Sequence, residues 1–233
     1  MLRVGLTGGL SSGKSTAARL FAAHGAHLLQ SDAIGREMME PGQAVYAAIV
    51  AYFGKGVVWP DGQLDRGALA KIAFSDGRVE ELNAIVHPAV IARQEELTEV
   101  IVQRDPDAVV IVESALIFET NYGAPRSGNH TGWHGRFDRI ILVTAPEEAK
   151  IARFVARSAA GSVFTEEKRE ELEAEARRRL AQQIPDEKKS ALADYVLTND
   201  GALAELEWQV DQLWPILKTA AEENGIALNL REC

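Results

Sequence analysis

The segment VGLTGGLSSGKST, residues 4–16, constrains the fold of this chain more than any other. It predicts a short apolar strand over 4–6, a glycine-rich turn, and a helix that begins at Lys14. The pattern G-x-x-x-x-G-K-[ST] is matched by Gly8, Gly13, Lys14 and Ser15. Glycines let successive backbone N–H groups point at one anion, and the new helix adds the positive end of its dipole. A plain glycine-rich turn is the alternative, but the strand before it and the helix after it favour a phosphate loop.

Two side chains of this loop have defined chemical tasks. Lys14 can reach the β- and γ-phosphates of a nucleotide as a mobile point charge. The hydroxyl of Ser15 can bind Mg²⁺, which prefers oxygen ligands. The loop therefore predicts ATP and Mg²⁺ as the bound species, although a phosphate loop alone does not define the reaction.

Four further runs predict strands that join the first one in a parallel sheet. Residues 108–112 (AVVIV) and 139–144 (RIILVT) are unbroken apolar runs, typical of strands buried on both faces, and 27–29 and 195–197 are shorter examples. Helices are predicted over 14–24, 146–157 and 202–223, the last with a kink at Pro215. Five strands that alternate with helices predict an α/β fold with a doubly wound five-stranded parallel sheet. Ligands bind such sheets at the carboxyl ends of the strands.

Composition limits the classes of function. A length of 233 residues suits one domain, and a net charge of −9 argues against a general nucleic-acid binder. Cys233 is the single cysteine, which excludes a disulfide within the chain and fits a reducing compartment. The phosphate loop begins too early for a secretory signal, and no apolar run approaches the ~20 residues of a membrane helix. We expect a cytoplasmic monomer that acts on small molecules and binds neither nucleic acid nor membrane.

Two acidic residues stand where the chemistry of such a sheet is expected. Asp32 follows the second strand at the edge that carries the phosphate loop, where a carboxylate can orient or accept the proton of an attacking hydroxyl. The alternative for Asp32 is an N-cap of a helix that begins at Ala33, and both interpretations can hold together. Glu113 ends the third strand, where a carboxylate often lies near the metal. A structural hydrogen-bond acceptor is an equally good interpretation of Glu113.

Two segments interrupt the alternation of strands and helices. Residues 165–183 are highly charged and predict a helix that is either a solvated surface helix or a source of arginines for the transferring phosphate. Residues 121–136 (NYGAPRSGNHTGWHGR) are glycine-rich and aperiodic and predict a long surface loop with little to bury. His130 and His134 have the spacing of metal ligands only on a helix, which the nearby glycines disfavour.

A series of motifs in this chain resembles the dephospho-coenzyme A kinase family, whose members catalyse the last step of coenzyme A synthesis. The matching stretches are LTGGLSSGKST at 6–16, SDAIGREMMEPG at 31–42, FGKGVVWPDGQLDRGALAKIAF at 53–74, LNAIVHP at 82–88, ALIFE at 115–119, RRLAQQIPDEKK at 178–189 and DYVLTNDG at 194–201. The resemblance implies a single P-loop kinase domain over 1–233 with an adenylate-kinase-like core at 1–31, 105–154 and 190–233. It also implies a helical acceptor-binding subdomain at 32–104, a lid at 155–189, and a loop insertion at 121–136 without a family counterpart. The implied reaction is ATP-dependent phosphorylation of the ribose 3′-hydroxyl of dephospho-coenzyme A to give coenzyme A and ADP.

The resemblance also assigns site residues, position by position. It implies catalytic roles for Asp32, Lys14 and Arg157, where Arg157 is a lid arginine. Metal ligation by Ser15 and Glu113 is predicted from the loop and the strand end, and not from the resemblance. Acceptor contacts are implied for Asp32, Arg36, His87 and Arg179, and nucleotide contacts for Gly8, Ser11, Ser12, Gly13, Lys14, Ser15, Thr16 and Asn199.

The chain departs from the family pattern at several positions. Gln30-Ser31-Asp32 stands where the family has Asp-Ala-Asp, so any task of the first aspartate is vacated. Ser11 replaces a usual glycine of the phosphate loop, and Ala115 replaces the proline before the Leu-Leu-Phe-Glu-like motif.

Three other classes of protein fit the sequence less well. A shikimate-type kinase needs a glycine triplet after its third strand, where this chain has Ser114-Ala115-Leu116. A nucleotide-dependent switch could use the D-x-x-G match at 32–35, but this match follows the phosphate loop too closely, and no N-K-x-D guanine-binding motif occurs. A nucleic-acid-dependent ATPase is disfavoured by the net charge of −9.

Overall fold

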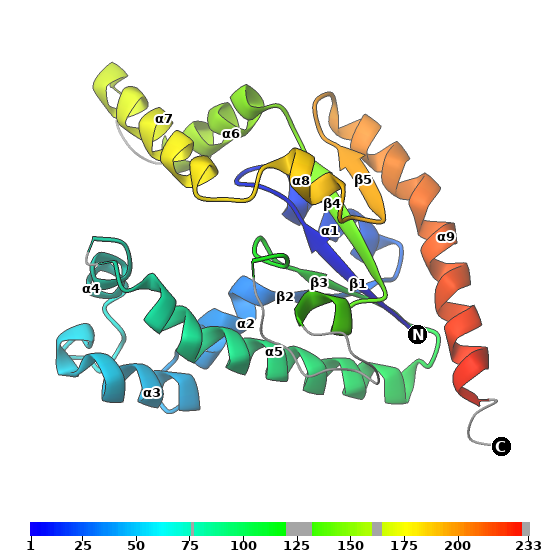
Figure 1. Cartoon of the computed structure of the whole chain (residues 1–233), viewed down its shortest axis with the longest axis horizontal. Helices are drawn as coiled ribbons and strands as arrows, with labels where there is room; N and C mark the ends of the chain where they lie inside the picture. The colour runs from blue at the N-terminus through cyan, green and yellow to red at the C-terminus, as the bar shows by residue number, and fades with distance from the viewer. Residues whose placement is uncertain (76, 120–131, 160–164, 230–233) are drawn as a thin grey trace.

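A five-stranded parallel sheet forms the centre of the molecule (Figure 1). The computed structural model describes residues 1–75, 77–119, 132–159 and 165–229. The strands are β1 (Leu2–Thr7), β2 (His27–Gln30), β3 (Val109–Glu113), β4 (Arg139–Thr144) and β5 (Tyr195–Thr198). They lie in the order β2-β3-β1-β4-β5, and every pair is parallel. The predicted doubly wound sheet is confirmed. β2 and β3 lie on one side of β1, and β4 and β5 lie on the other, so the strand order changes direction beside β1, where such sheets bind ligands.

Helices cover both faces of the sheet, because its central strands are apolar on both sides. Val109 and Ile111 of β3 pack into the core that α1 (Lys14–Ala23) and α9 (Leu203–Asn229) cover. Val110 and Val112 point to the opposite face, where they pack against α2 (Ser31–Met38) and α5 (Val79–Arg104). Alternate side chains of one β-branched run thus supply two separate cores, which explains why this strand reads as a continuous apolar run.

Two helical lobes project beyond the carboxyl ends of the strands (Figure 1). One contains α3 (Ala44–Phe53), η1 (Lys55–Val57), α4 (Arg66–Ala70) and the π-helical turn η2 (Lys71–Ser75), with a small core of its own around Ile49 and Val57. The other pairs α6 (Glu147–Ala159) with α7 (Glu166–Ala181), which pack through Ile151, Phe154 and Ala176. α8 (Asp186–Ser190) then leads back to β5. The lobes coincide with the segments expected to bind the acceptor and to form a lid, and that assignment stays a prediction.

The structure corrects the expectation for the end of the 121–136 segment. Residues 121–131, including His130, lie outside the described residues. The short 3-10 helix η3 (Gly132–Gly135) places Trp133 edge-on against Phe118, with ring centroids 5.0 Å apart, in a cluster with Ile117 and Ile140. Arg136 is 8% exposed. The last residues of this segment are therefore part of the folded core, because one tryptophan offers enough apolar area to anchor a glycine-rich turn.

The C-terminal helix also differs from its prediction. α9 continues from Leu203 through Pro215 to Asn229, beyond the expected end at 223. Its buried side chains, among them Leu206, Val210 and Leu217, pack on the sheet. No helix among the described residues combines the length and apolar character that a membrane span needs.

Candidate active site

The phosphate loop has the strained backbone that its glycines permit. Gly13 has φ 102°, and a Cβ there would lie 2.0 Å from Nδ2 of Asn199. A Cβ on Gly8 would lie 2.2 Å from the backbone oxygen of Val143. Neither position can hold a side chain without moving its neighbour, so the loop depends on both glycines. Ser11, the departure from the family glycine, also lies in the left-handed region with φ 52°.

Lys14 points back over this loop from the first turn of α1. Its Nζ donates a hydrogen bond to the backbone oxygen of Gly9 at 3.1 Å. Burial lowers the pKa of Lys14 from its usual range, although Glu113 and Asp32 act in the opposite direction. A desolvated ammonium of this kind gains from the arrival of an anion, as a phosphate group would be.

Ser15, Glu113 and Gln30 form a hydrogen-bonded chain beside the loop. The hydroxyl of Ser15 donates to Oε1 of Glu113 at 2.5 Å, and Nε2 of Gln30 donates to Oε2 at 2.7 Å. Gln30 and Glu113 are register partners on β2 and β3, so the strand pairing itself brings them together. Because the proton of Ser15 is directed at Glu113, its oxygen lone pairs remain available to a cation. Gln30 therefore takes a defined place in the site, although the family aspartate is absent.

These residues fit a magnesium ion that also takes phosphate oxygens. Mg²⁺ is usually held by one or two protein oxygens and completed by water and phosphate, and Ser15 and Glu113 offer such oxygens at the mouth of the loop. No group of three His, Cys, Asp or Glu side chains in the described part of the chain could hold a metal by itself. His134 stacks on Trp133 instead, with ring centroids 3.5 Å apart.

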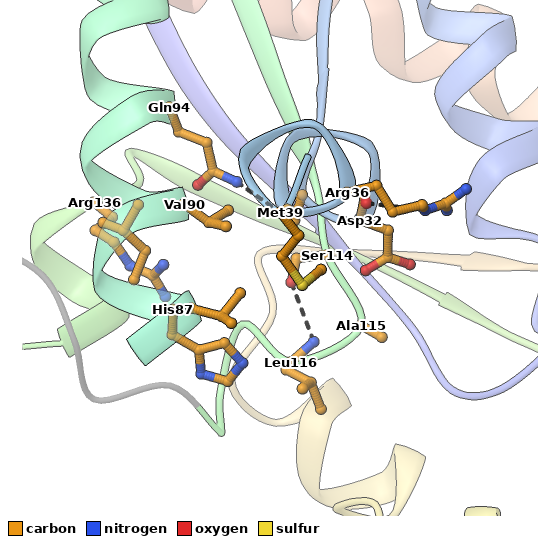
Figure 2. Close-up of a pocket in the computed structure, with 14 residues that line it drawn as sticks. Asp32, Arg36, Met39, His87, Val90, Gln94, Ser114, Ala115, Leu116 and Arg136 are labelled. Carbon is orange, nitrogen blue, oxygen red and sulfur yellow. Dashed lines mark hydrogen bonds between the residues drawn. The ribbon is translucent and has the colours of Figure 1, made fainter. Parts of the chain in front are cut away.

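Asp32 lies on the boundary between two cavities. A cavity of about 160 Å³ is lined by Asp32 together with Lys14, Ser15 and Glu113. A cavity of about 370 Å³ on its other side is lined by Asp32 and by residues of α2, α5 and the segment after β3 (Figure 2). Asp32 is the second residue of α2, whose N-cap is Gln30, and no side-chain cap is present. The capping interpretation of Asp32 is therefore wrong, because the helix begins at Ser31, two residues earlier than expected.

Other predicted site residues line these cavities as well. Arg36 borders both, and His87 lies in the larger one (Figure 2). Burial lowers the pKa of His87, and the nearby Arg136 lowers it further. Ser114 and Ala115, which follow β3, also border both cavities.

The helical lobe formed by α6 and α7 contacts the phosphate loop through Arg157. Nη2 of Arg157 on α6 donates to Oγ of Ser11 at 3.1 Å. Asn199, after β5, donates from Nδ2 to the backbone oxygen of Ser12 at 2.9 Å. Arg179 does not share these contacts with the loop residues: its Nε donates to Glu175 on its own helix at 2.6 Å, and its guanidinium lies over Phe154.

Several contacts around the loop were not predicted from the sequence. Oε1 of Gln183 accepts from the backbone N–H of Leu10 at 3.0 Å, and Lys150 forms an ion pair with Asp186. Oγ1 of Thr144 donates to the same Asp186 carboxylate at 2.5 Å. These polar residues come from β4, α6, α8 and the turn between α7 and α8, far from the loop in sequence. Only the Q-x-P-D spacing of 183–186 indicates any of them.

Arg136 is another unpredicted residue of the site. It lines the larger cavity beside His87, although it comes from the segment that was expected to form a surface loop. No apolar pattern in the glycine-rich sequence around Arg136 predicts that its side chain is buried.

A phosphate loop at the reversal point of a parallel sheet, with a carboxylate between it and a second cavity, defines a P-loop kinase. The family model described as dephospho-CoA kinase matches residues 2–205. Dephospho-CoA kinase of Thermobifida fusca is 37% identical over 219 residues, which cover 94% of this chain and 97% of the relative. The enzyme of Streptomyces avermitilis is 39% identical over 226 residues, with 97% and 98% covered. The chain belongs to the dephospho-CoA kinase family of phosphotransferases, which use ATP to convert dephospho-CoA to CoA.

Solved structures give the same fold. TT1252 from Thermus thermophilus is 32% identical with a TM-score of 0.68, and the match covers 93% of this chain and 97% of that one. Dephospho-CoA kinase from Campylobacter jejuni is 21% identical with a TM-score of 0.56, and the match covers 92% and 96% of the two chains. The second likeness supports the fold only.

Proposed function

We propose that this protein transfers the γ-phosphoryl group of ATP to the ribose 3′-hydroxyl of dephospho-coenzyme A, which gives coenzyme A and ADP. One observation carries the assignment of roles: Asp32 borders both the phosphate-loop cavity and the larger cavity. A hydroxyl held in the larger cavity at Asp32 faces a phosphate held by the loop. That is the arrangement which an in-line phosphoryl transfer requires.

The donor side of the reaction belongs to the phosphate loop. The loop N–H groups from Gly8 to Thr16 and the ammonium of Lys14 bind the terminal phosphates of ATP, and Asn199 supports the loop through Ser12. Ser15 and Glu113 would hold Mg²⁺, which supplies neutralisation of the phosphate charge when bound.

The acceptor side belongs to Asp32 and the larger cavity. The Asp32 carboxylate accepts a hydrogen bond from the 3′-hydroxyl, orients its oxygen toward the γ-phosphorus, and takes the proton as the new bond forms. Arg36 and His87 contact the acceptor from the walls of that cavity. Arg157, which already reaches the loop at Ser11, stabilises the negative charge that spreads over the transferring group.

The helical lobes have matching roles in this proposal. Residues 32–104 form the acceptor-binding subdomain and 155–189 form the lid, whose closure brings Arg179 to the substrates and excludes water. Arg179 must then leave Glu175, an exposed pairing that costs little to break.

We further propose that the protein works as a cytoplasmic monomer on small molecules, without nucleic acid or membrane. The net charge of −9 supports the absence of a nucleic-acid partner.

A panel of acceptors tests the proposed function. Purified protein with MgATP is assayed for ADP release with dephospho-coenzyme A, shikimate, nucleoside monophosphates, or no acceptor. We expect turnover with dephospho-coenzyme A well above the acceptor-free rate. Equal ADP release without acceptor, or turnover with shikimate alone, would overturn the proposal.

A further inference from the structure

The larger cavity carries more positive charge than an acidic protein would lead one to expect. Its ionisable lining residues are Asp32, Arg36, His87 and Arg136. The lowered pKa of His87 leaves that ring neutral at pH 7, so two guanidinium groups face one carboxylate. A cavity with this balance suits an anionic ligand rather than a neutral one.

Arg136 is the more deeply placed of the two arginines. It is 8% exposed, and its Nη2 donates to the backbone oxygen of Ile117 at 3.3 Å. Its guanidinium also lies 5.1 Å from the ring centroid of Phe137. Burial lowers the pKa of Arg136 to about 10, in spite of the opposing effect of Glu95, so the side chain stays cationic at neutral pH. Such a desolvated cation gains electrostatic free energy when an anion enters beside it.

The two ends of the cavity differ in chemistry. In Figure 2, Asp32 and Arg36 stand on one side, and His87 and Arg136 stand on the other. In a nucleotide, the 5′-diphosphate branches from C4′ of the ribose, next to the C3′ that carries the 3′-hydroxyl. With the 3′-hydroxyl at Asp32, this branch can extend across the cavity to the cationic side lined by His87 and Arg136.

We propose that Arg136 binds the 5′-diphosphate of the acceptor, with His87 beside it, and so selects diphosphate-bearing acceptors over neutral nucleosides. This inference rests on the proposed function, because Asp32 fixes the direction in which the acceptor lies. Guanidinium groups suit this task, since their planar set of donors matches two phosphate oxygens at once. The sequence resemblance assigned no role to Arg136, so its contact with the acceptor is argued from the cavity alone.

Arg136→Gln tests the assignment, because the amide keeps a donor for Ile117 and removes the charge. Its matched control is Arg139→Gln on β4, an exposed arginine that donates to the backbone oxygen of Asp138 outside the cavity. We expect the KM for dephospho-coenzyme A to rise roughly 10- to 100-fold in Arg136→Gln, the usual loss for one charge-assisted hydrogen bond. The kcat at saturating acceptor and the KM for MgATP should stay within about threefold of wild type. The control should leave all three constants unchanged.

A neutral ligand separates recognition of the diphosphate from general damage to the cavity. Adenosine is measured as a competitive inhibitor against dephospho-coenzyme A, with MgATP saturating so that the donor site is filled. If Arg136 binds the diphosphate, the inhibition constant of adenosine stays the same in Arg136→Gln while the KM of the acceptor rises. Equal weakening of both ligands, or an unchanged acceptor KM, would overturn the proposal.

Two further results keep the outcomes distinct. If Arg136→Gln melts below the assay temperature, the same measurements are made on Arg136→Lys instead. It keeps the charge but loses the planar donors, so a KM rise of roughly 3- to 10-fold with unchanged adenosine inhibition supports the proposal, and a wild-type KM contradicts it. If wild-type protein fails to phosphorylate dephospho-coenzyme A, the proposed function fails instead, whatever the variants do.

Discussion

Replacing Asp32 by Asn removes the proposed base while nearly all of its shape remains. The structure allows the cost to the fold and the cost to turnover to be worked out separately. Asp32 is exposed, sits in the first turn of α2 and makes no capping hydrogen bond, so the fold loses only a favourable charge at the positive helix end. That loss amounts to about 0.3–1 kcal/mol in the free energy of unfolding.

The expected effect on turnover is much larger. A positioned acid–base group contributes roughly 10²–10⁴ in rate, which corresponds to about 2.7–5.4 kcal/mol in activation free energy. MgATP affinity should change little, because the donor is held by the loop, Lys14 and Ser15. The kcat of Asp32→Asn should therefore fall by roughly two to four orders of magnitude, with little change in melting temperature.

The assay is steady-state kinetics with saturating MgATP and dephospho-coenzyme A, together with a thermal melt of each variant. Glu37→Gln is the matched control, since Glu37 is an exposed carboxylate on the same helix. A near-normal kcat in Asp32→Asn would refute the role of Asp32 in proton transfer. A drop of equal size in the control would show that the charge of α2, rather than the position of Asp32, matters.

Three other changes have expected outcomes that follow from burial and charge. Lys14→Ala should leave the melting temperature without ligand almost unchanged, because a desolvated ammonium with a lowered pKa contributes little net stability. It should reduce the rise in melting temperature that MgATP produces, since an intact site gains about 2.7 kcal/mol of stability at a ligand concentration of a hundred times Kd. A collapsed fold would contradict this prediction. Because the folded pKa of His87 lies below its ordinary 6.5, the unfolded chain binds more protons there and stability falls as the pH drops through that range. His87→Gln should therefore lose less melting temperature than wild type between about pH 7.5 and about pH 5.5, and an equal loss would exclude His87 as the cause. Lys189 is fully buried, and its Nζ lies 3.0 Å from Oε1 of Glu119. Lys189→Met should therefore cost about 3–5 kcal/mol in the free energy of unfolding, and adding Glu119→Leu should restore much of that loss. No recovery in denaturant titrations would show that the unpaired Glu119 is not the cause of the loss.

Local patterns in the sequence predict the sheet and the phosphate loop well. The run at 108–112 and the glycines at 8 and 13 owe their conformations to their own side chains or the lack of them. A β-branched run favours a strand wherever it lies, and a positive φ favours glycine in any fold. These features need no knowledge of distant parts of the chain.

The contacts between distant segments could not be predicted in the same way. Gln30 reads as the loss of an aspartate, yet strand pairing turns it into a donor to Glu113. Arg136 reads as part of a polar loop, yet Trp133 anchors that turn and brings the guanidinium into the cavity. In both cases the role depends on the register or packing of another element, which no local pattern encodes.

Helix boundaries decided one interpretation. Both the capping role and the catalytic role of Asp32 fit the sequence, because a shift of only two residues in the start of α2 separates them. Only the observed N-cap at Gln30 removes the capping alternative, since helix ends are poorly defined by sequence.

The position of the transferred phosphate decides whether this protein phosphorylates the ribose 3′-hydroxyl of dephospho-coenzyme A. The product of a reaction with MgATP and dephospho-coenzyme A is isolated and examined by ³¹P NMR and by comparison with authentic coenzyme A. We expect the two resonances of the diphosphate plus one phosphomonoester on the ribose 3′-oxygen, and one ADP for each product molecule. A phosphate on any other oxygen of the acceptor, or ADP and inorganic phosphate with the acceptor unchanged, would contradict it.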